Sequence, residues 1–265
     1  MPQDKSPRSR RLGPLAEIVR ARLRQGHRTH AFPDAPVTLP ARFRGRPVLS
    51  PEKCQDGCRA CVEACPVGAL SLAPLRLDLG ACLFCPGCEE ACPGGAIAFT
   101  RDHRLAASAR EELTVERDEV FLARALKDEL LRVYGRSLRL RQVSAGGCNA
   151  CEADLNVAAN VNTFDMSRFG IQFVASPRHA DGVVITGPVT DSMRPALLET
   201  WDAIPSPRIA VALGACAIAG GPFRGSGPHA NGVPPEIPVD LYVPGCPPHP
   251  FTILDGFLRM LGRMS

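Results

Sequence analysis

The sequence contains no apolar run approaching the roughly 18 residues that predict a membrane-spanning helix. It also lacks an export signal, because Glu17 and three arginines interrupt the apolar stretch that should follow the paired arginine in "SRRLGPL". We therefore expect a cytoplasmic protein that reaches a membrane only at its cytoplasmic face, through membrane subunits of a larger complex. Four apolar positions instead fit one face of a short helix: Leu15, Ile18, Val19 and Leu23.

The net charge of +4 is unevenly distributed along the 265 residues. Up to Arg46 there are 11 Lys and Arg against 3 Asp and Glu, so the remainder carries 20 basic and 24 acidic residues, a balance of −4. The basic segment could touch anionic lipid or nucleic acid, but such segments are most often only solvated. We predict no nucleic-acid partner.

Because an export signal is lacking, the 12 cysteines are not expected to form disulfides, since the cytosol keeps thiols reduced. Metal binding is the better interpretation. The cysteines form three groups of four and leave none spare: Cys54, Cys58, Cys61 and Cys65; Cys82, Cys85, Cys88 and Cys92; and Cys148, Cys151, Cys216 and Cys246.

The second group, followed by Pro93, matches the spacing CxxCxxCxxxCP at every position. In that pattern three cysteines hold one [4Fe-4S] cluster and the fourth crosses to a second cluster. The first group, followed by Pro66, has one extra residue before Cys58, which Gly57 can absorb in a turn. We therefore assign two crossed sets: Cys54, Cys58, Cys61 and Cys92 to cluster 1, and Cys82, Cys85, Cys88 and Cys65 to cluster 2.

Two zinc ribbons are the rival interpretation of this repeat, since zinc sites also use CxxC pairs. Zinc sites do not need the CxxxCP ending. Residues 49–100 resemble the two-cluster bacterial-type ferredoxin domain, and this resemblance implies an α+β ferredoxin-like fold for residues 47–103. Alternating apolar residues predict short strands at 69–73, 75–79 and 96–100.

The segment 104–136 is charged and has helical periodicity, so it predicts a linker helix. Thr114 can cap its start and Gly135 is a natural stop. Its apolar stripe is expected to pack against the neighbouring domains, with docking of a partner as the alternative. The stripe consists of Leu122, Leu126, Leu130 and Val133.

Five short apolar runs follow in residues 137–265, several of them separated by helical stretches at 153–160, 192–203 and 250–261. This alternation predicts an α/β domain with a mostly parallel, flavodoxin-like sheet. The runs "LRLRQV", "RIAVALG" and "VDLYVPG" each end just before cysteines of the third group. Because ligand sites lie at the carboxyl ends of parallel strands, these four cysteines can converge there.

Three segments carry a resemblance to a known family: "GGCNACEADLN", "GACAIAGGPF" and "VPGCPPHP". They resemble the cluster-binding segments of the small subunits of energy-converting nickel-iron hydrogenases, including formate hydrogenlyase, and of the B-type (20 kDa) subunit of NADH-quinone oxidoreductase. The resemblance spans residues 138–261. It implies a third [4Fe-4S] cluster with Cys148, Cys151, Cys216 and Cys246 as ligands, facing the active centre of a separate large subunit.

One departure within this resemblance favours the hydrogenase branch. The quinone oxidoreductase subunits have the first two cysteines adjacent, whereas Asn149 and Ala150 separate Cys148 from Cys151. Glu152 matches an acid that the family often carries near this position, where it could relay protons. The alternative is that Glu152 only stabilises a helix start through the helix dipole.

The six histidines show no ligand spacing, and we expect each to be structural or exposed: His27, His30, His103, His179, His229 and His249. His249 could also form a hydrogen bond close to the third cluster.

Since three clusters use every cysteine, the catalytic centre must lie on another chain. We predict an electron-transfer subunit that relays single electrons through three [4Fe-4S] clusters between a redox donor or acceptor protein and a large catalytic subunit of a nickel-iron hydrogenase-like complex. The alternatives are a quinone-reducing subunit of a complex I-like NADH-quinone oxidoreductase, a stand-alone ferredoxin-type carrier, and a zinc scaffold.

Overall fold

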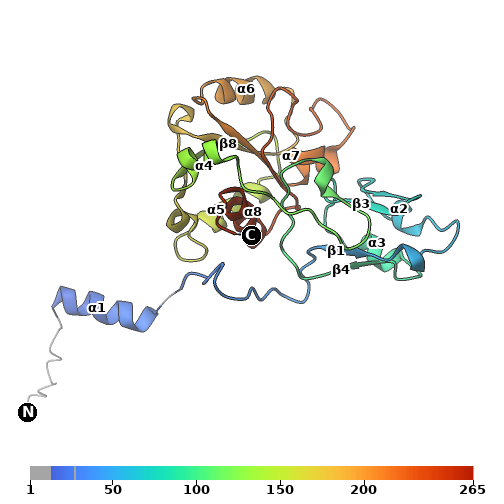
Figure 1. The fold of residues 1–265 in the computed structure, drawn as a ribbon, viewed down its shortest axis with the longest axis horizontal. Helices are drawn as coiled ribbons and strands as arrows, with labels where there is room; N and C mark the ends of the chain where they lie inside the picture. Colours follow the sequence, from blue (N-terminus) through green and yellow to red (C-terminus); the bar gives the residue numbers. More distant parts are fainter. Residues whose placement is uncertain (1–12, 27, 265) are drawn as a thin grey trace, which may run out of the picture.

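The computed structural model describes residues 13–26 and 28–264, which form a larger α/β part, a smaller part beside it and one outlying helix (Figure 1). The outlying helix, α1 (Pro14–Gln25), confirms the short helix predicted from its apolar spacing. The paired arginine of "SRRLGPL" and His27 lie outside the described residues. Within the described ranges, no helix combines the length and apolar character needed to cross a membrane.

The larger part is built on a five-stranded sheet in which every strand pairing is parallel. The five predicted apolar runs all form strands of this sheet, and the order β10-β9-β8-β6-β7 is that of flavodoxin-like doubly wound folds. The strands are β6 (Leu138–Ser144), β7 (Ile171–Phe173), β8 (Gly182–Thr186), β9 (Ile209–Leu213) and β10 (Leu241–Val243).

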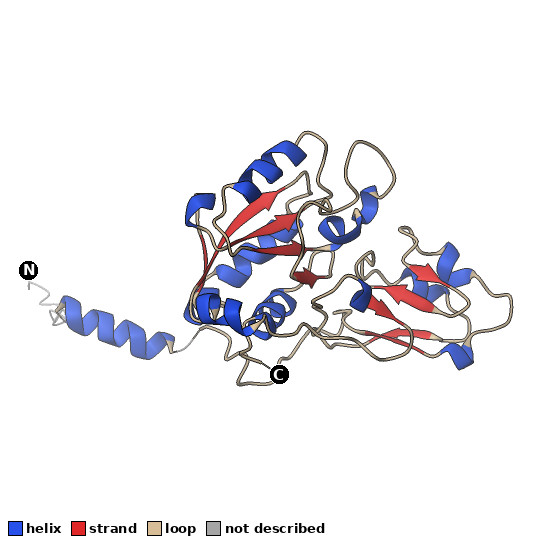
Figure 2. Ribbon diagram, turned by 45° about the horizontal axis from the view of Figure 1, so that its top comes forward, coloured by secondary structure: helices blue, strands red, loops and turns tan. Residues whose placement is uncertain are grey.

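Helices cover both faces of this sheet, so its central strands are buried on both sides (Figure 2). Val184 of β8 packs into the core that contains α5 and α8, while its neighbours Val183 and Ile185 pack against α6. The helices predicted at 153–160, 192–203 and 250–261 are confirmed. The elements are α5 (Ala150–Ala159), α6 (Arg194–Asp202), α7 (Ala215–Ala219) and α8 (Pro250–Met260), with short 3₁₀ helices at Met166–Phe169, Pro177–His179 and Gly221–Phe223.

The smaller part consists of two short antiparallel sheets and two short helices, so it mixes both types of element. The strands predicted at 69–73, 75–79 and 96–100 are present. Its assignment to the ferredoxin-like fold stays a prediction. The elements are β1 (Pro47–Leu49), a 3₁₀ helix at Pro51–Lys53, α2 (Ala60–Glu63), β2 (Leu70–Ser71), β3 (Arg76–Asp78), α3 (Gly87–Ala91), β4 (Ile97–Phe99) and β5 (Thr114–Val115).

The linker helix predicted over residues 104–136 is wrong for most of its length. Helix α4 covers only Asp128–Tyr134, and Thr114 lies in strand β5 instead of capping a helix. Burial overrides the local helical pattern, because Val115 is fully buried and pairs with Leu77 of β3 in the smaller part. The predicted stop is confirmed, since Gly135 follows α4 directly.

One hydrophobic core joins the two parts of the molecule. Leu79 and Ala81 of the smaller part share it with Ala217 and Ile218 of α7. A bridge of two backbone hydrogen bonds, 2.9 and 3.0 Å long, also ties residue 107 to residue 242 of β10. These contacts fix the smaller part against α7 and β10 of the larger part.

Candidate functional site: three groups of four cysteines

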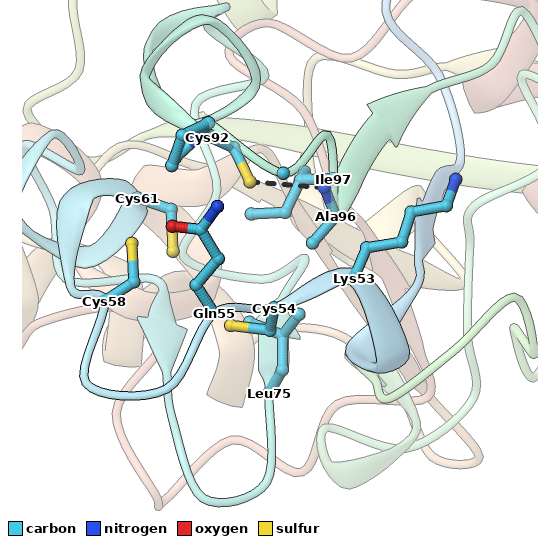
Figure 3. Close-up of a pocket in the computed structure, with 11 residues that line it drawn as sticks. Lys53, Cys54, Gln55, Cys58, Cys61, Leu75, Cys92, Ala96 and Ile97 are labelled. Atoms are coloured by element: carbon cyan, nitrogen blue, oxygen red, sulfur yellow. Dashed lines mark hydrogen bonds between the residues drawn. The ribbon is translucent and has the colours of Figure 1, made fainter.

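The first predicted set of cysteines lines one pocket of the smaller part. Figure 3 shows the thiols of Cys54, Cys58 and Cys61 facing a common space together with that of Cys92, which comes from the other loop. Burial and then the charges of Cys92 and Cys54 raise the pKa of Cys61. The extra residue before Cys58 is absorbed at Gly57, whose φ is +72°.

The second predicted set also lies together. Burial, opposed by a hydrogen bond from the Phe84 N–H, raises the pKa of Cys82 to about 12. The charges of Cys88, Cys65 and Cys85 contribute to this rise. Cys65 of the first loop therefore lies near the cysteines of the second loop. Burial and then the charges of Cys85 and Cys65 likewise raise the pKa of Cys88 to about 11.

The crossing cysteines occupy equivalent positions in the two copies of the repeat. The sulfur of Cys65 accepts a hydrogen bond from the Ala69 N–H at 3.2 Å, and that of Cys92 accepts one from the Ala96 N–H at 3.2 Å. In iron-sulfur proteins, hydrogen bonds to the cysteine sulfurs help to set the reduction potential of the cluster. The two copies of the sequence repeat therefore place the sulfurs of Cys65 and Cys92 in equivalent hydrogen bonds.

The third group lies at the carboxyl ends of strands β6, β9 and β10, as predicted from the spacing. Burial raises the pKa of Cys151 strongly, and the charges of the three other cysteines of the group add to the rise. Burial followed by the charges of Cys246 and Cys148 raises the pKa of Cys216 to about 11. Cys148 and Cys246 are exposed, so this group opens onto the protein surface.

Gly214, at the end of β9, leaves the space that the third group needs. Its φ is +90°, and a Cβ at this position would lie 2.5 Å from the sulfur of Cys151. A side chain there would therefore collide with a predicted ligand and would also strain the backbone.

The second and third groups are neighbours in space. The charge of Cys85 contributes to the raised pKa of Cys246, after burial and Cys148. Phe84 lines a pocket together with Gly245 and Pro247, the two residues that flank Cys246. The Phe84 carbonyl accepts a hydrogen bond from Arg44 Nε at 2.8 Å. Sequence reasoning missed this adjacency, because nothing in the spacing relates the loop at 82–88 to the loop at 246.

Glu152 lies in the first turn of α5 and is only 4% exposed. Burial alone would raise its pKa, but hydrogen bonds from Ser144 and Thr186 lower it below the usual range, and the Thr186 hydroxyl lies 2.6 Å from Oε1. Neither hydroxyl partner was predicted from the sequence, although each is a polar residue that ends an apolar strand. The proton-relay role of Glu152 stays a prediction.

The described histidines that lie near the third group have structural contacts. His249 precedes α8, where its Nδ1 accepts a hydrogen bond from the Phe251 N–H at 3.2 Å. Its ring stacks on Phe251 at an interplanar angle of 13°. His103 is buried against the rings of Phe32 and Phe251, and burial lowers its pKa to about 4.

The donor sets fit iron-sulfur clusters. Each set offers four thiols, and in the first two sets backbone N–H groups point at sulfur. Across the described ranges, no three His, Cys, Asp or Glu side chains converge closely enough to hold a single metal ion. A four-iron cluster does not need that convergence, because each cysteine binds a different iron atom. Because ligand thiols bind iron as thiolates, cluster binding would release protons from the thiols whose pKa burial raises, among them Cys61, Cys82 and Cys216.

Comparison with known proteins supports the assignment of the larger part. The family model described as NADH ubiquinone oxidoreductase, 20 Kd subunit, matches residues 148–260 and so includes the whole third cysteine group. Formate hydrogenlyase subunit 7 of Escherichia coli K12 is 43% identical over 141 residues, which is 53% of this chain and 55% of that relative. The B-type subunit of NADH-quinone oxidoreductase from Heliobacterium modesticaldum is 45% identical over 117 residues, or 44% of this chain and 67% of the relative.

A probable membrane-bound hydrogenase subunit of Pyrococcus furiosus is 39% identical over 138 residues, which cover 52% of this chain and 81% of that relative. The chain belongs to the 20 kDa subunit family of NADH ubiquinone oxidoreductase. The chain matches these three relatives over about half of its own length. It spans about half the length of formate hydrogenlyase subunit 7.

Proposed function

We propose that the chain is an electron-transfer subunit that relays single electrons through three [4Fe-4S] clusters between a redox partner and a separate large catalytic subunit. The observation that carries this proposal is that the second and third cysteine groups are neighbours, because Phe84, next to Cys85, lines one pocket with Gly245 and Pro247, which flank Cys246. Clusters bound in these groups would supply one-electron chemistry at accessible potentials.

The residues of the chain contribute binding, order and shielding. Cys54, Cys58, Cys61 and Cys92 share a pocket of the smaller part and would hold the cluster at one end of the series. The exposed Cys148 and Cys246 mark the surface where a large subunit would dock. Backbone N–H groups aimed at sulfur stabilise the thiolates, and the shared core keeps the groups at a constant separation.

The names of the relatives suggest the kind of assembly. They are subunits of formate hydrogenlyase, of a probable membrane-bound hydrogenase and of NADH-quinone oxidoreductase. We infer a subunit of a larger membrane-associated complex of the nickel-iron hydrogenase type, since two residues separate Cys148 from Cys151. A quinone-reducing role in a complex I-like enzyme is the second candidate, and the 45% identity to the B-type subunit of NADH-quinone oxidoreductase favours it.

Replacing Cys246 with alanine tests the proposal in the isolated complex. We expect electron flow between the natural partner and the large subunit to fall to background, because the third group joins the other two groups to the docking surface. The measurement is turnover of the complex, with spectroscopy confirming that the two clusters of the smaller part remain.

The co-purifying large chain distinguishes the two candidate functions. A large chain with two CxxC pairs suited to nickel supports the hydrogenase type, and one without them supports the quinone type. Undiminished turnover in the Cys246→Ala complex would show that the third group is not on the electron path, and would contradict the proposal.

A further inference from the structure

Helix α1 is an amphipathic helix that stands away from the rest of the molecule (Figure 1). Its large apolar side chains are exposed, with Leu15 and Leu23 each 79% exposed, and no residue of α1 is buried. Across residues 13–26 and 28–264, α1 takes no part in the three hydrophobic cores, and no hydrogen bond joins it to the α/β or smaller part.

A short helix with an exposed apolar face needs a surface of another molecule to pack against. An isolated helix of 12 residues is marginal in water, and helices in proteins are stabilised mainly by packing an apolar face. The chain rejoins the body just after α1, where the His30 N–H donates to the Thr163 carbonyl at 2.7 Å and Thr29 Oγ1 donates to the Val161 carbonyl at 3.2 Å. The root of α1 is thus attached while its apolar face is free to dock.

The charge around α1 indicates what it docks on. Residues 1–28 contain 8 Lys and Arg against 2 Asp and Glu. Within α1, Arg20 and Arg24 lie four residues apart on the side opposite the apolar face, and the only acid is Glu17. We propose that α1 docks on a membrane surface of anionic phospholipid, lying in the plane of the headgroups with its apolar face turned to the acyl chains.

Arg22 favours lipid over a protein groove. It lies on the apolar face, since it is four residues after Ile18 and three after Val19, and it is exposed. At a membrane surface its aliphatic stem can lie along the acyl region while the guanidinium reaches a phosphate. In an apolar protein groove the same charge would need a dedicated carboxylate. This contact would attach the chain to the membrane directly, independently of its clusters and of partner subunits.

Binding of the full chain to vesicles tests this inference. We expect the chain to float with vesicles of phosphatidylcholine and phosphatidylglycerol and to bind far less to phosphatidylcholine alone, with added salt weakening the anionic binding. Replacing both Arg20 and Arg24 with glutamine should weaken that binding about twenty-fivefold, since each basic side chain contributes about a factor of five near such a surface.

Variants of the apolar face provide the matched comparison. Ile18→Ser combined with Val19→Ser should abolish binding to anionic vesicles, whereas Ala21→Ser on the polar face should bind as the wild type does. Because α1 is outside the hydrophobic cores, all variants should keep the same thermal unfolding midpoint. The proposal is overturned if the wild-type chain does not bind anionic vesicles, or if the double serine variant binds them equally well. If the wild-type chain binds no vesicles and the double serine variant is missing from the purified complex, the apolar face of α1 docks on a partner protein instead.

Discussion

Replacing Cys92 with alanine is expected to remove the cluster of the other loop and to spare the cluster of its own loop. Cys92 follows Cys82, Cys85 and Cys88 in the sequence, yet its thiol faces the pocket lined by Cys54, Cys58 and Cys61. Loss of this ligand should release the cluster held by those three cysteines or reduce it to a three-iron form. The readout is electron paramagnetic resonance of the reduced protein.

Two reference variants make this result unambiguous. Cys58→Ala removes a ligand that belongs to the first pocket, and Cys85→Ala removes one that belongs to the second set. The spectrum of Cys92→Ala should match that of Cys58→Ala, and the spectrum of Cys65→Ala should match that of Cys85→Ala, because the two crossing cysteines are exchanged between loops. A Cys92→Ala spectrum that matches Cys85→Ala would contradict the crossed assignment.

Replacing Gly214 with alanine is expected to eliminate the third cluster without changing any of its ligands. The added Cβ would lie 2.5 Å from the sulfur of Cys151, and the φ of +90° disfavours any residue with a side chain. Such a contact cannot be relieved without displacing Cys151 or the end of strand β9. Iron analysis should show a loss of about one four-iron cluster, with the spectra of the other two preserved.

Gly227→Ala is the matched control, because a Cβ at Gly227 meets no atom within 4 Å. This variant should retain the full iron content. If Gly214→Ala also retains it, the third group does not hold a cluster in the geometry described above.

The third cysteine group was predictable from the sequence because two independent patterns agree. The apolar runs give parallel strands, and the cysteines follow those strands at the end where ligand sites form. The placement of Cys92 in the pocket of the other loop was predictable because the repeat spacing is typical of exchanged cysteines. The crossed ligand assignment itself stays a prediction. Local signals sufficed in both cases.

Long-range packing was not predictable from the same signals. The segment around Leu113 and Val115 carries helical periodicity, but both side chains fill the core that contains Leu77 of β3. A single 3₁₀ turn (Glu111–Leu113) and then strand β5 form there instead of a long helix. The proximity of Cys85 to Cys246 depends on how Leu79 and Ala81 pack against α7. Neither contact leaves a trace in local spacing or composition.

Metal analysis of the anaerobically purified full chain tests the central claim most directly. Twelve cysteines in three groups of four should hold about 12 iron atoms and a similar amount of acid-labile sulfide per chain, with little zinc. This composition would also account for every cysteine of the sequence. Stoichiometric zinc with little iron would contradict the account, because zinc cannot carry electrons between the groups.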